Sequence, residues 1–403
     1  MSSSYKNVIY TISFMDLFAV GLFVPLFGNH LKSLGASHFV VGLVGSVYSG
    51  IQIISGPIFG SWSDVGDRKT VLIISLILSA VCYSLLGFLS SIGTVVLIRV
   101  LIGVVKHTQG ICKAMISDLF PSEKLAEMLS RSAALGTMGF IVGPVIGGYI
   151  SELPNGFTYV CLLTSTFFFS NIVLASYLPS FKPKHRNEPT VQTEIKQELL
   201  KIGSNLKKVN IRENWDLFSM RLLFGIATSM YFHNQAIYMR EYFNLNQVNI
   251  GYLISFIGIV QTCSVFSLGH INQIFYKHET DCSRRMFHFF SLMSCSSILL
   301  YFTDDIKLFL LFIIPFAISS SVLRISTMEL LLGQCSKEQK GTFSGVSNSI
   351  ASVAKFITPL ISGLIIDFTS IHVSILLPSV PALLGSFVSL KVMSKMENIK
   401  KGH

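Results

Sequence analysis

Seven ionisable residues lie inside stretches of the chain that are otherwise apolar. They are Asp16, Arg99, Lys106, His107, His233, Arg324 and Lys355. On the insertion scale, a Lys, Arg or Asp at the centre of a membrane helix costs about 2.5–3.5 kcal/mol, so such residues face a cavity or a partner. A buried carboxylate beside a lysine can exchange a proton, because burial and a neighbouring charge act on its pKa in opposite directions. The seven residues therefore predict a polar cavity suited to binding protons and a small solute.

The spacing of the bases in the fourth apolar stretch predicts that they share one side of a helix. Arg99, Lys106 and Lys113 follow one another at steps of seven, and seven residues turn a helix by two turns less about 20°. Arg99 and Lys113 are near the ends, where their side chains can reach the headgroups. Lys106 is too deep for that, and its depth of roughly 12 Å matches that of Asp16.

The elements that must position these residues are membrane-spanning helices. Of the 403 residues, 51% are hydrophobic and 13% charged, whereas soluble domains have about 25% charged residues. A helix needs about 20 mostly apolar residues to cross the hydrocarbon core, and helices satisfy their own backbone hydrogen bonds there. We expect twelve spans, at 8–28, 39–61, 71–90, 93–115, 129–152, 157–178, 217–239, 250–271, 286–303, 306–330, 343–366 and 371–391.

The distribution of Lys and Arg predicts that both termini are cytoplasmic. With that orientation, 21 of these residues lie in cytoplasmic segments and 3 lie on the opposite side. Short cytoplasmic loops carry an excess of Lys and Arg. The same distribution explains the net charge of +10 without a nucleic-acid partner, which would need a basic patch on a soluble face. Which membrane holds the protein stays open.

The chain divides into two halves of six spans. We expect bundles at 1–178 and 217–391, a cytoplasmic linker at 179–216 and a cytoplasmic tail at 392–403. Gly143-Pro144 in span five has a counterpart in Thr358-Pro359 in span eleven, 215 positions later. Glu123 and Ser132 match Glu338 and Ser347 at the same offset. Duplication of a six-helix unit leaves such a weak repeat, although chance matching of apolar segments also contributes.

Several functional classes have no support in the sequence. The seven Cys are scattered, most of them inside apolar stretches, so we expect no metal site and no cofactor. No phosphate-binding loop is present, which argues against an ATP-driven pump. No catalytic residues are expected. The predicted partners are a small solute, protons and the lipid bilayer, and the chain is expected to be a monomer.

The sequence contains two glycine-containing motifs, one in the loop between spans two and three and one inside span five. Between spans two and three the chain reads Gly60-Ser-Trp-Ser-Asp64-Val-Gly-Asp-Arg68-Lys69. Span five contains Gly139, Gly143, Pro144, Gly147 and Gly148. Small residues permit close packing of helices, and a proline bends a helix. We expect Gly60 to permit a close approach of this kind, and Asp64 to face a cation or a helix N-terminus.

Both motifs resemble those of the major facilitator superfamily, which has twelve helices in two six-helix pseudo-repeats. The loop fits the superfamily pattern at Gly60, Asp64, Arg68 and Lys69, whereas Val65 and Asp67 depart from it. The resemblance implies that the loop is a conformational switch, with Arg68 reaching Asp118 at the end of span four. The span-five motif is typical of the superfamily's proton-coupled antiporters, and packing with no bearing on coupling is the alternative.

Shorter stretches narrow the resemblance. Span one, from Asp16 to Pro25, is similar to the first helix of tetracycline-type efflux antiporters. Lys32–Ser37, Lys106-His-Thr108 and Gly251–Ser255 resemble an orphan group that includes the major facilitator superfamily domain-containing protein 9 and organic-cation-transporter-like relatives. This resemblance implies a transporter-like fold without indicating a substrate.

The superfamily fold implies that spans one, four, seven and ten line a central cavity. We therefore expect Asp16 and Lys106 to approach each other there, either to couple protons to solute or as a structural ion pair. Arg324 and Lys355 either favour an anionic or zwitterionic solute or bond helix carbonyls. His233 either carries protons or is a satisfied polar residue. A secondary active transporter is thus predicted; the alternative is a non-transporting receptor, sensor or scaffold with the same fold.

Overall fold

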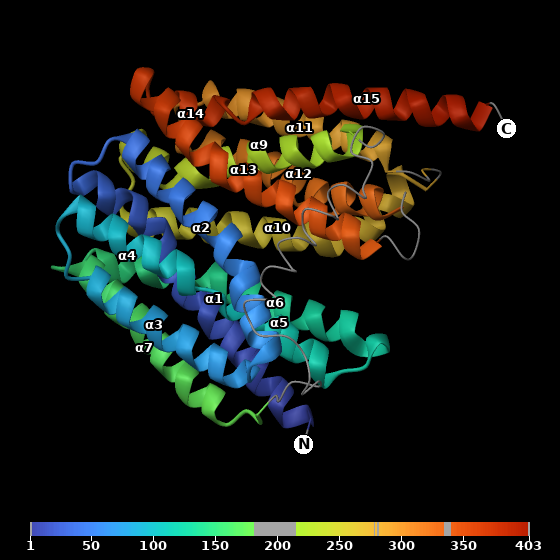
Figure 1. Ribbon diagram of the computed structural model, residues 1–403. Coiled ribbons are helices and arrows are strands. Elements are labelled where there is room, and N and C mark those ends of the chain that lie inside the picture. Colours follow the sequence, from blue (N-terminus) through green and yellow to red (C-terminus); the bar gives the residue numbers. More distant parts are fainter. Residues whose placement is uncertain (1, 181–214, 278, 280–281, 334–339, 402–403) are drawn as a thin grey trace. The chain divides into compact units, whose positions relative to one another are not determined.

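The computed structural model describes residues 2–180, 215–277, 279, 282–333 and 340–401. Every regular element within these ranges is a helix (Figure 1). The helices of the first half are α1 (Ser2–Ser33), α2 (His38–Val65), α3 (Arg68–Leu86), α4 (Ile92–Val105), α5 (Thr108–Leu119), α6 (Ser122–Ser151) and α7 (Gly156–Ser176). Those of the second half are α9 (Trp215–Glu241), α10 (Gln247–Phe275), α11 (Ser283–Tyr301), α12 (Ile306–Gly333), α13 (Lys340–Phe368), α14 (Val373–Leu376) and α15 (Ser379–Lys401).

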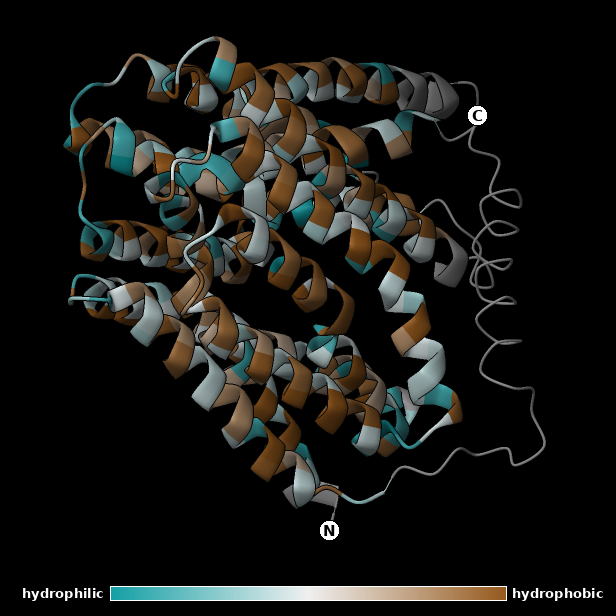
Figure 2. Ribbon diagram, turned by 60° about the vertical axis from the view of Figure 1, so that its left-hand side comes forward, coloured by the Kyte–Doolittle hydropathy of each residue, from teal (hydrophilic) through white to brown (hydrophobic). Residues whose placement is uncertain are grey.

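The helices have the length and composition of membrane spans. Ten helical segments of the described chain are long and apolar enough to cross a bilayer. The other two expected spans correspond to α9 and α11, with 27 and 19 residues. Figure 2 shows apolar residues along most helices and polar residues concentrated at their ends and in loops. The all-α, twelve-span fold class is therefore confirmed.

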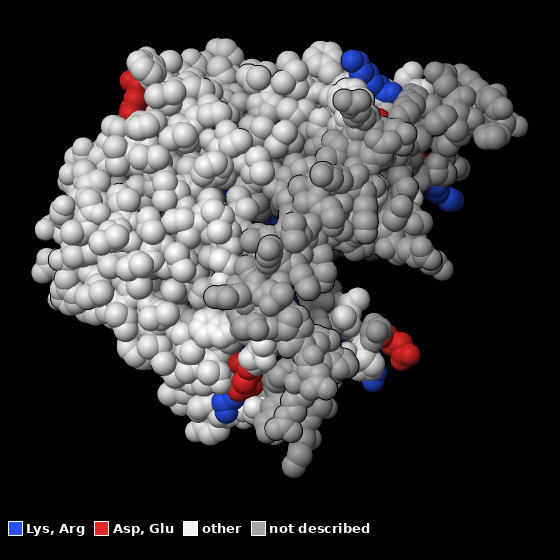
Figure 3. All heavy atoms as spheres, viewed as in Figure 1, with Lys and Arg blue, Asp and Glu red and all other residues white. Residues whose placement is uncertain are grey.

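Much of the described surface is apolar. Leu97 on α4 and Phe266 on α10 are 59% and 79% exposed, and many other large apolar side chains are exposed as well. On the face drawn in Figure 3, few described atoms carry charge, and uncharged atoms cover broad areas between them. Apolar patches of this extent mark contact with another apolar phase. The protein is therefore an integral, multi-pass membrane protein.

The chain forms two compact units. Each unit also contains the first residues of one helix whose remaining residues belong to the other unit. Unit 1 contains 1–36, 47–201 and 245–255, and unit 2 contains 37–46, 202–244 and 256–403. The first residues of α2 therefore pack in unit 2, and those of α10 pack in unit 1. In unit 1, α1 packs on α6 and α7, and α3 packs on α7; in unit 2, α9 packs on α12, α13 and α15.

The two exchanged helix starts make equivalent contacts at the repeated prolines. In unit 1, a Cβ on Gly251 of α10 would clash with the carbonyl oxygen of Pro144, and in unit 2 one on Gly42 of α2 would clash with that of Pro359. A serine of each exchanged helix start also bonds the backbone near the proline, in different ways: Ser46 Oγ accepts a hydrogen bond from the Leu360 amide at 3.0 Å, whereas Ser255 Oγ donates to the carbonyl of Ile141. These contacts give the repeat a structural meaning, because each exchanged helix start approaches the backbone at one of the two repeated prolines.

Three expectations about the elements change or lie outside the described residues. The span expected at 93–115 is present as Ile92–Leu119, but it is not one continuous helix, because the helix breaks at Lys106 and His107. The helix that begins at Ser379 continues to Lys401, beyond the expected start of the tail at 392. Most of the linker 179–216 and Glu338, one member of the proposed repeat, lie outside the described residues. The bundle boundaries stay a prediction.

Candidate functional site

The break between α4 and α5 lies deep in unit 1, and neighbouring helices satisfy the carbonyl groups that it leaves. Lys106 has φ −81° and ψ 76°, which ends the helix. Ser55 Oγ donates to the Gly103 carbonyl at 3.2 Å, and the Gln52 amide donates to the Lys106 carbonyl at 3.3 Å. Ser75 Oγ donates to the Val105 carbonyl at 2.5 Å. A helix end buried in an apolar region needs such donors, so side chains of α2 and α3 stabilise the break.

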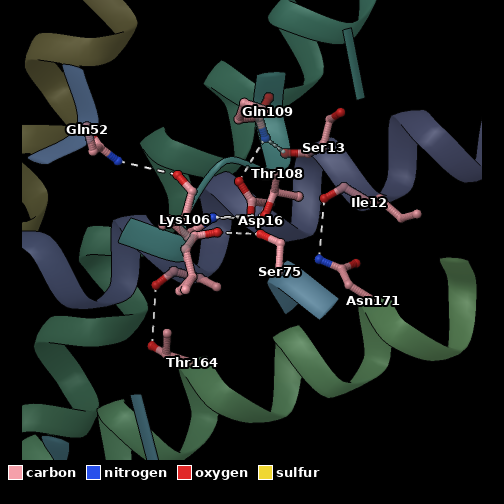
Figure 4. A network of polar contacts seen from close by, with 12 residues as sticks. Ile12, Ser13, Asp16, Gln52, Ser75, Lys106, Thr108, Gln109, Thr164 and Asn171 are labelled. Carbon is pink, nitrogen blue, oxygen red and sulfur yellow. Dashed lines mark hydrogen bonds and ion pairs between the residues drawn. The ribbon is translucent and has the colours of Figure 1, made fainter. Parts of the chain in front are cut away.

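The break presents the Lys106 side chain to Asp16 on α1. Lys106 Nζ and Asp16 Oδ1 form an ion pair, with Asp16 fully buried and Lys106 only 9% exposed. The Gln109 amide donates to Asp16 Oδ2 at 2.9 Å, and Lys106 Nζ lies 4.7 Å from the centre of the Phe168 ring. Figure 4 shows the two charged groups pointing toward each other within this network. The site can therefore hold one charge of each sign away from water.

Because the helix is interrupted, Arg99, Lys106 and Lys113 do not share one side of a continuous helix, contrary to what their spacing of seven predicts. Arg99 and Lys106 are buried, whereas Lys113 on α5 is exposed, because the interruption changes the direction of the chain after Lys106. His107 follows Lys106 in the break, and its Nε2 lies 2.8 Å from Ser55 Oγ. Its ring packs against that of Phe59 at a centroid distance of 5.0 Å. His107 thus helps to hold α2 against the break.

Arg99 is a second buried cation in unit 1, enclosed by aromatic rings. Its guanidinium lies 4.0 Å from the Tyr48 ring centre, 4.8 Å from that of Phe27 and 5.4 Å from that of Phe23, and the residue is 8% exposed. A cation over aromatic faces is stabilised by the ring quadrupoles. Arg99 makes no ion pair with any residue in the described ranges. With Arg99, Lys106 and Asp16, the buried interior of unit 1 holds an excess of positive charge.

The remaining predicted cavity residues lie in unit 2. His233 on α9 packs against α2, where a Cβ on Gly45 would come within 2.6 Å of its ring. Arg324 on α12 and Lys355 on α13 have exposed side chains. Neither makes a hydrogen bond to a helix carbonyl within the described part of the chain. The structure therefore places Asp16, Arg99, Lys106 and His107 in one unit and the other three residues in the second.

The loop between α2 and α3 is held by Arg68. Its guanidinium contacts Asp64 at 2.7 Å and also pairs with Asp118 at the end of α5. Lys69 Nζ donates to the carbonyls of Ser176 and Leu178, at 2.6 and 2.7 Å. A cation is stabilised at a helix C-terminus, so Lys69 ties α3 to the end of α7.

One expectation about this loop is wrong. A Cβ on Gly60 would meet no atom of the described residues within 4 Å, so no described helix approaches Gly60 closely. The departures at Val65 and Asp67 leave both ion pairs of Arg68 in place. Asp67 instead stands at the N-cap of α3 with extended backbone angles, and its carboxylate accepts from Thr70 Oγ1 at 3.0 Å.

The second half has an equivalent of this loop that the sequence analysis missed. Arg285 at the start of α11 contacts Glu329 on α12 at 2.6 Å and Asn272 on α10 at 2.6 Å. Arg285, Glu329 and Asn272 lie in spans nine, ten and eight, the second-half counterparts of the spans that hold Arg68, Asp118 and Asp64, but they do not follow the offset of 215. The signal available in the sequence was the basic pair Arg284-Arg285 at a span start, without the glycine and aspartate of the first loop.

Cys282 lies beside this second loop. Burial is the main effect that raises the pKa of its thiol to about 12, and the nearby carboxylate of Glu329 acts in the same direction. Arg285 acts against both. The thiol is therefore protonated at physiological pH and is not a nucleophile there.

The glycines of the span-five motif let α6 contact the backbone of α1. A Cβ on Gly139 would come within 2.5 Å of the Phe14 carbonyl oxygen, and one on Gly143 within 2.7 Å of that of Phe18. A Cβ on Gly147 would overlap the backbone of Leu22 in α1, and one on Gly148 would come within 2.6 Å of the Gln247 carbonyl oxygen in α10. Pro144 lies between these contacts, inside α6. The motif therefore sets the position of α1 and, with it, of Asp16.

Known proteins share this architecture. A sequence model described as Major Facilitator Superfamily matches residues 9–280, which is more than half of the chain. The tetracycline resistance protein, class H, of Pasteurella multocida is 24% identical over 268 residues; that match covers 63% of each protein, less than two thirds of that relative's length. The quinolone resistance protein NorA of Staphylococcus aureus (strain COL) is 25% identical over 375 residues, 89% of each.

A solved structure has the same fold. The crystal structure of the human organic anion transporter MFSD10 (TETRAN) matches with a TM-score of 0.66 and 18% identity. The match covers 96% of this chain and 99% of that one. This likeness establishes that the two proteins share a fold.

Proposed function

The chain belongs to the major facilitator superfamily, and on this premise we propose that it is a proton-coupled secondary transporter of a small anionic or zwitterionic solute. The observation that carries the proposal is the buried pair of Asp16 and Lys106 at the helix break. Family members named for tetracycline and quinolone resistance support secondary transport as the general activity. Both termini are proposed to be cytoplasmic, as the distribution of Lys and Arg indicates.

The pair can couple the two ligands because both interact with Lys106. When Asp16 is charged, it neutralises Lys106 and repels an entering anion. When Asp16 is protonated, the ion pair is lost and Lys106 is free to bind an anionic group of the solute. Binding of a proton and of an anion are then linked, and by thermodynamic reciprocity each strengthens the other. Desolvation makes this coupling strong, because unpaired charges are costly in an apolar interior.

Alternating access would use the two loops described above. In unit 1, ion pairs of Arg68 join α3 to α2 and α5. In unit 2, Arg285 joins α11 to α12 by an ion pair and to α10 by a hydrogen bond. In this proposal they stabilise one conformation and separate in the other. The alternative of a non-transporting receptor or scaffold gains no support from the loop, since Val65 and Asp67 leave the Arg68 pairs intact.

The test is a solute screen with purified protein in proteoliposomes that carry a pH-sensitive dye inside. For a transported solute, the wild type should move protons across the bilayer when a solute gradient is imposed. Asp16→Asn should abolish proton movement while leaving solute exchange at equal pH. Glu127→Gln is the matched control, because Glu127 forms an exposed ion pair with Arg131. Full proton movement in Asp16→Asn would refute coupling at this site.

A further inference from the structure

Unit 2 has three basic residues on helices that pack on one another, namely Arg221 on α9, Arg324 on α12 and Lys355 on α13; Figure 1 shows the three helices. Arg221 interacts electrostatically with Arg324 and with Lys355. Two of these helices, α9 and α13, pack closely at this level: a Cβ on Gly225, one turn after Arg221, would come within 2.9 Å of that of Ala354, next to Lys355. Arg221 and Lys355 therefore lie where α9 and α13 pack closely.

The three charges have no acidic partner. In the described ranges, none of them forms an ion pair, and the nearby Glu329 is engaged by Arg285 instead. Arg221 Nη1 donates to Thr327 Oγ1 at 3.1 Å, while its buried Nε has no partner among the described atoms. Arg324 and Lys355 keep exposed surface, although protein atoms surround their charged ends and exclude part of the solvent. The side chains thus remain able to reach a ligand.

Such a cluster is unfavourable unless an anion joins it. Like charges repel more strongly where protein excludes water, and Arg221, Arg324 and Lys355 add up to three positive charges. A guanidinium presents parallel N–H donors that match the oxygens of a carboxylate or a phosphate, and an ammonium adds a point charge. A doubly charged oxyanion offers enough oxygens for all three side chains and leaves one net positive charge. A single carboxylate would leave two net positive charges.

From these contacts we propose that Arg221, Arg324 and Lys355 bind the head group of a doubly charged organic anion, a dicarboxylate or a phosphate monoester. This inference rests on the proposed transport function and narrows its substrate class. Thr327 positions Arg221 for the ligand. The site lies wholly within unit 2 and requires no contribution from the Asp16–Lys106 pair.

The test measures binding without transport. Purified full-length protein in detergent is heated with succinate, phenyl phosphate or acetate, at an ionic strength held constant with sodium chloride. A ligand that binds only the folded state raises the unfolding temperature. Succinate or phenyl phosphate should raise it, and acetate should raise it much less. Equal shifts with all three anions would overturn the proposal.

Variants separate this site from general charge effects. Arg221→Gln and Lys355→Gln should each weaken binding at least about tenfold, the effect of losing one charge-assisted hydrogen bond. Lys355→Arg should keep most of the binding. Lys391→Gln, which removes an exposed charge elsewhere in unit 2, is the matched control and should bind as the wild type does. Equal binding in all variants, or equal weakening in the control, would contradict the proposal.

A second readout does not depend on ligand. Without an anion, Lys355→Gln should unfold at a higher temperature than the wild type, because it removes repulsion with Arg221. A lower unfolding temperature would contradict the repulsion on which the site is argued. The two proposals fail separately: proton-coupled transport without dianion binding overturns only this site, and dianion binding with unchanged coupling in Asp16→Asn overturns only the coupling.

Discussion

Replacing one member of the Asp16–Lys106 pair should destabilise the protein more than replacing both. Asp16 is fully buried and Lys106 is 9% exposed, so Asp16→Asn leaves an ammonium enclosed with no counter-charge. Breaking a buried ion pair by removing one partner costs about 3–5 kcal/mol. The carboxamide oxygen introduced by this substitution would still accept from Gln109, which places the expected loss near the lower figure. Lys106→Met leaves the carboxylate with the Gln109 hydrogen bond alone and should cost a similar amount.

The double variant, Asp16→Asn with Lys106→Met, removes both charges, so no uncompensated charge is left in the interior to destabilise the protein. Substituting apolar or neutral groups for a buried pair is often neutral or stabilising. We therefore expect the double variant to unfold within about 1 kcal/mol of the wild type. The methionine side chain keeps the contact with Phe168, so little packing is lost.

The assay is equilibrium unfolding in mixed micelles of a mild detergent and sodium dodecyl sulfate, read as a free energy of unfolding. Arg131→Ala is the control, because its pair with Glu127 has side chains that are 58% and 53% exposed. Such exposed pairs contribute about 0.3–0.5 kcal/mol. If the single variants cost no more than Arg131→Ala, or if their losses add in the double variant, the reasoning about a buried, mutually compensated pair is refuted.

Three further predictions concern other parts of the structure. Gly143→Ala should lower the free energy of unfolding by about 1–3 kcal/mol, because its Cβ overlaps the backbone of α1, whereas Gly60→Ala should cause no loss; equal effects in the same unfolding assay would contradict the difference in packing. Arg68→Ala should shift the conformational equilibrium about tenfold, which corresponds to about 1.4 kcal/mol; labelling rates of a cysteine placed in the cavity measure the shift, and Asp118→Asn should reproduce it. Cys282, as the single cysteine of the chain, should react slowly with maleimide at pH 7 and faster as the pH rises toward its pKa of about 12; a rate equal to that of free cysteine at pH 7 would argue against burial of the thiol.

The broad architecture was predictable because its cause is local. Each span is an apolar run of sufficient length, and the bilayer demands that such a run be helical. The pairing of Arg68 with Asp118 was predicted from the resemblance of the loop to the superfamily motif, and the structure contains it. The loop around Arg285 was not recognised, because its carboxylate and amide partners stand on two other helices and leave no continuous pattern.

The role assigned to Gly60 was wrong for a related reason. A glycine's chemical freedom is visible in the sequence, but the backbone that approaches it is not. A Cβ on Gly60 would meet none of the described atoms within 4 Å, while one on Gly139 or Gly143 would overlap the backbone of α1. The same residue type therefore has different consequences at positions that look alike in the chain.

The order of residues alone indicates the number of spans, the repeat at Pro144 and Pro359 and the presence of charges in apolar stretches. These features depend on hydrophobicity and on proline, whose effects on the chain are local. The break at Lys106 cannot. It exists because Gln52, Ser55 and Ser75, on two other helices, supply hydrogen bonds to the carbonyls that an uninterrupted helix would have used. The cluster of Arg221, Arg324 and Lys355 likewise arises only where three helices pack, since charge repulsion and ligand binding depend on distances in space.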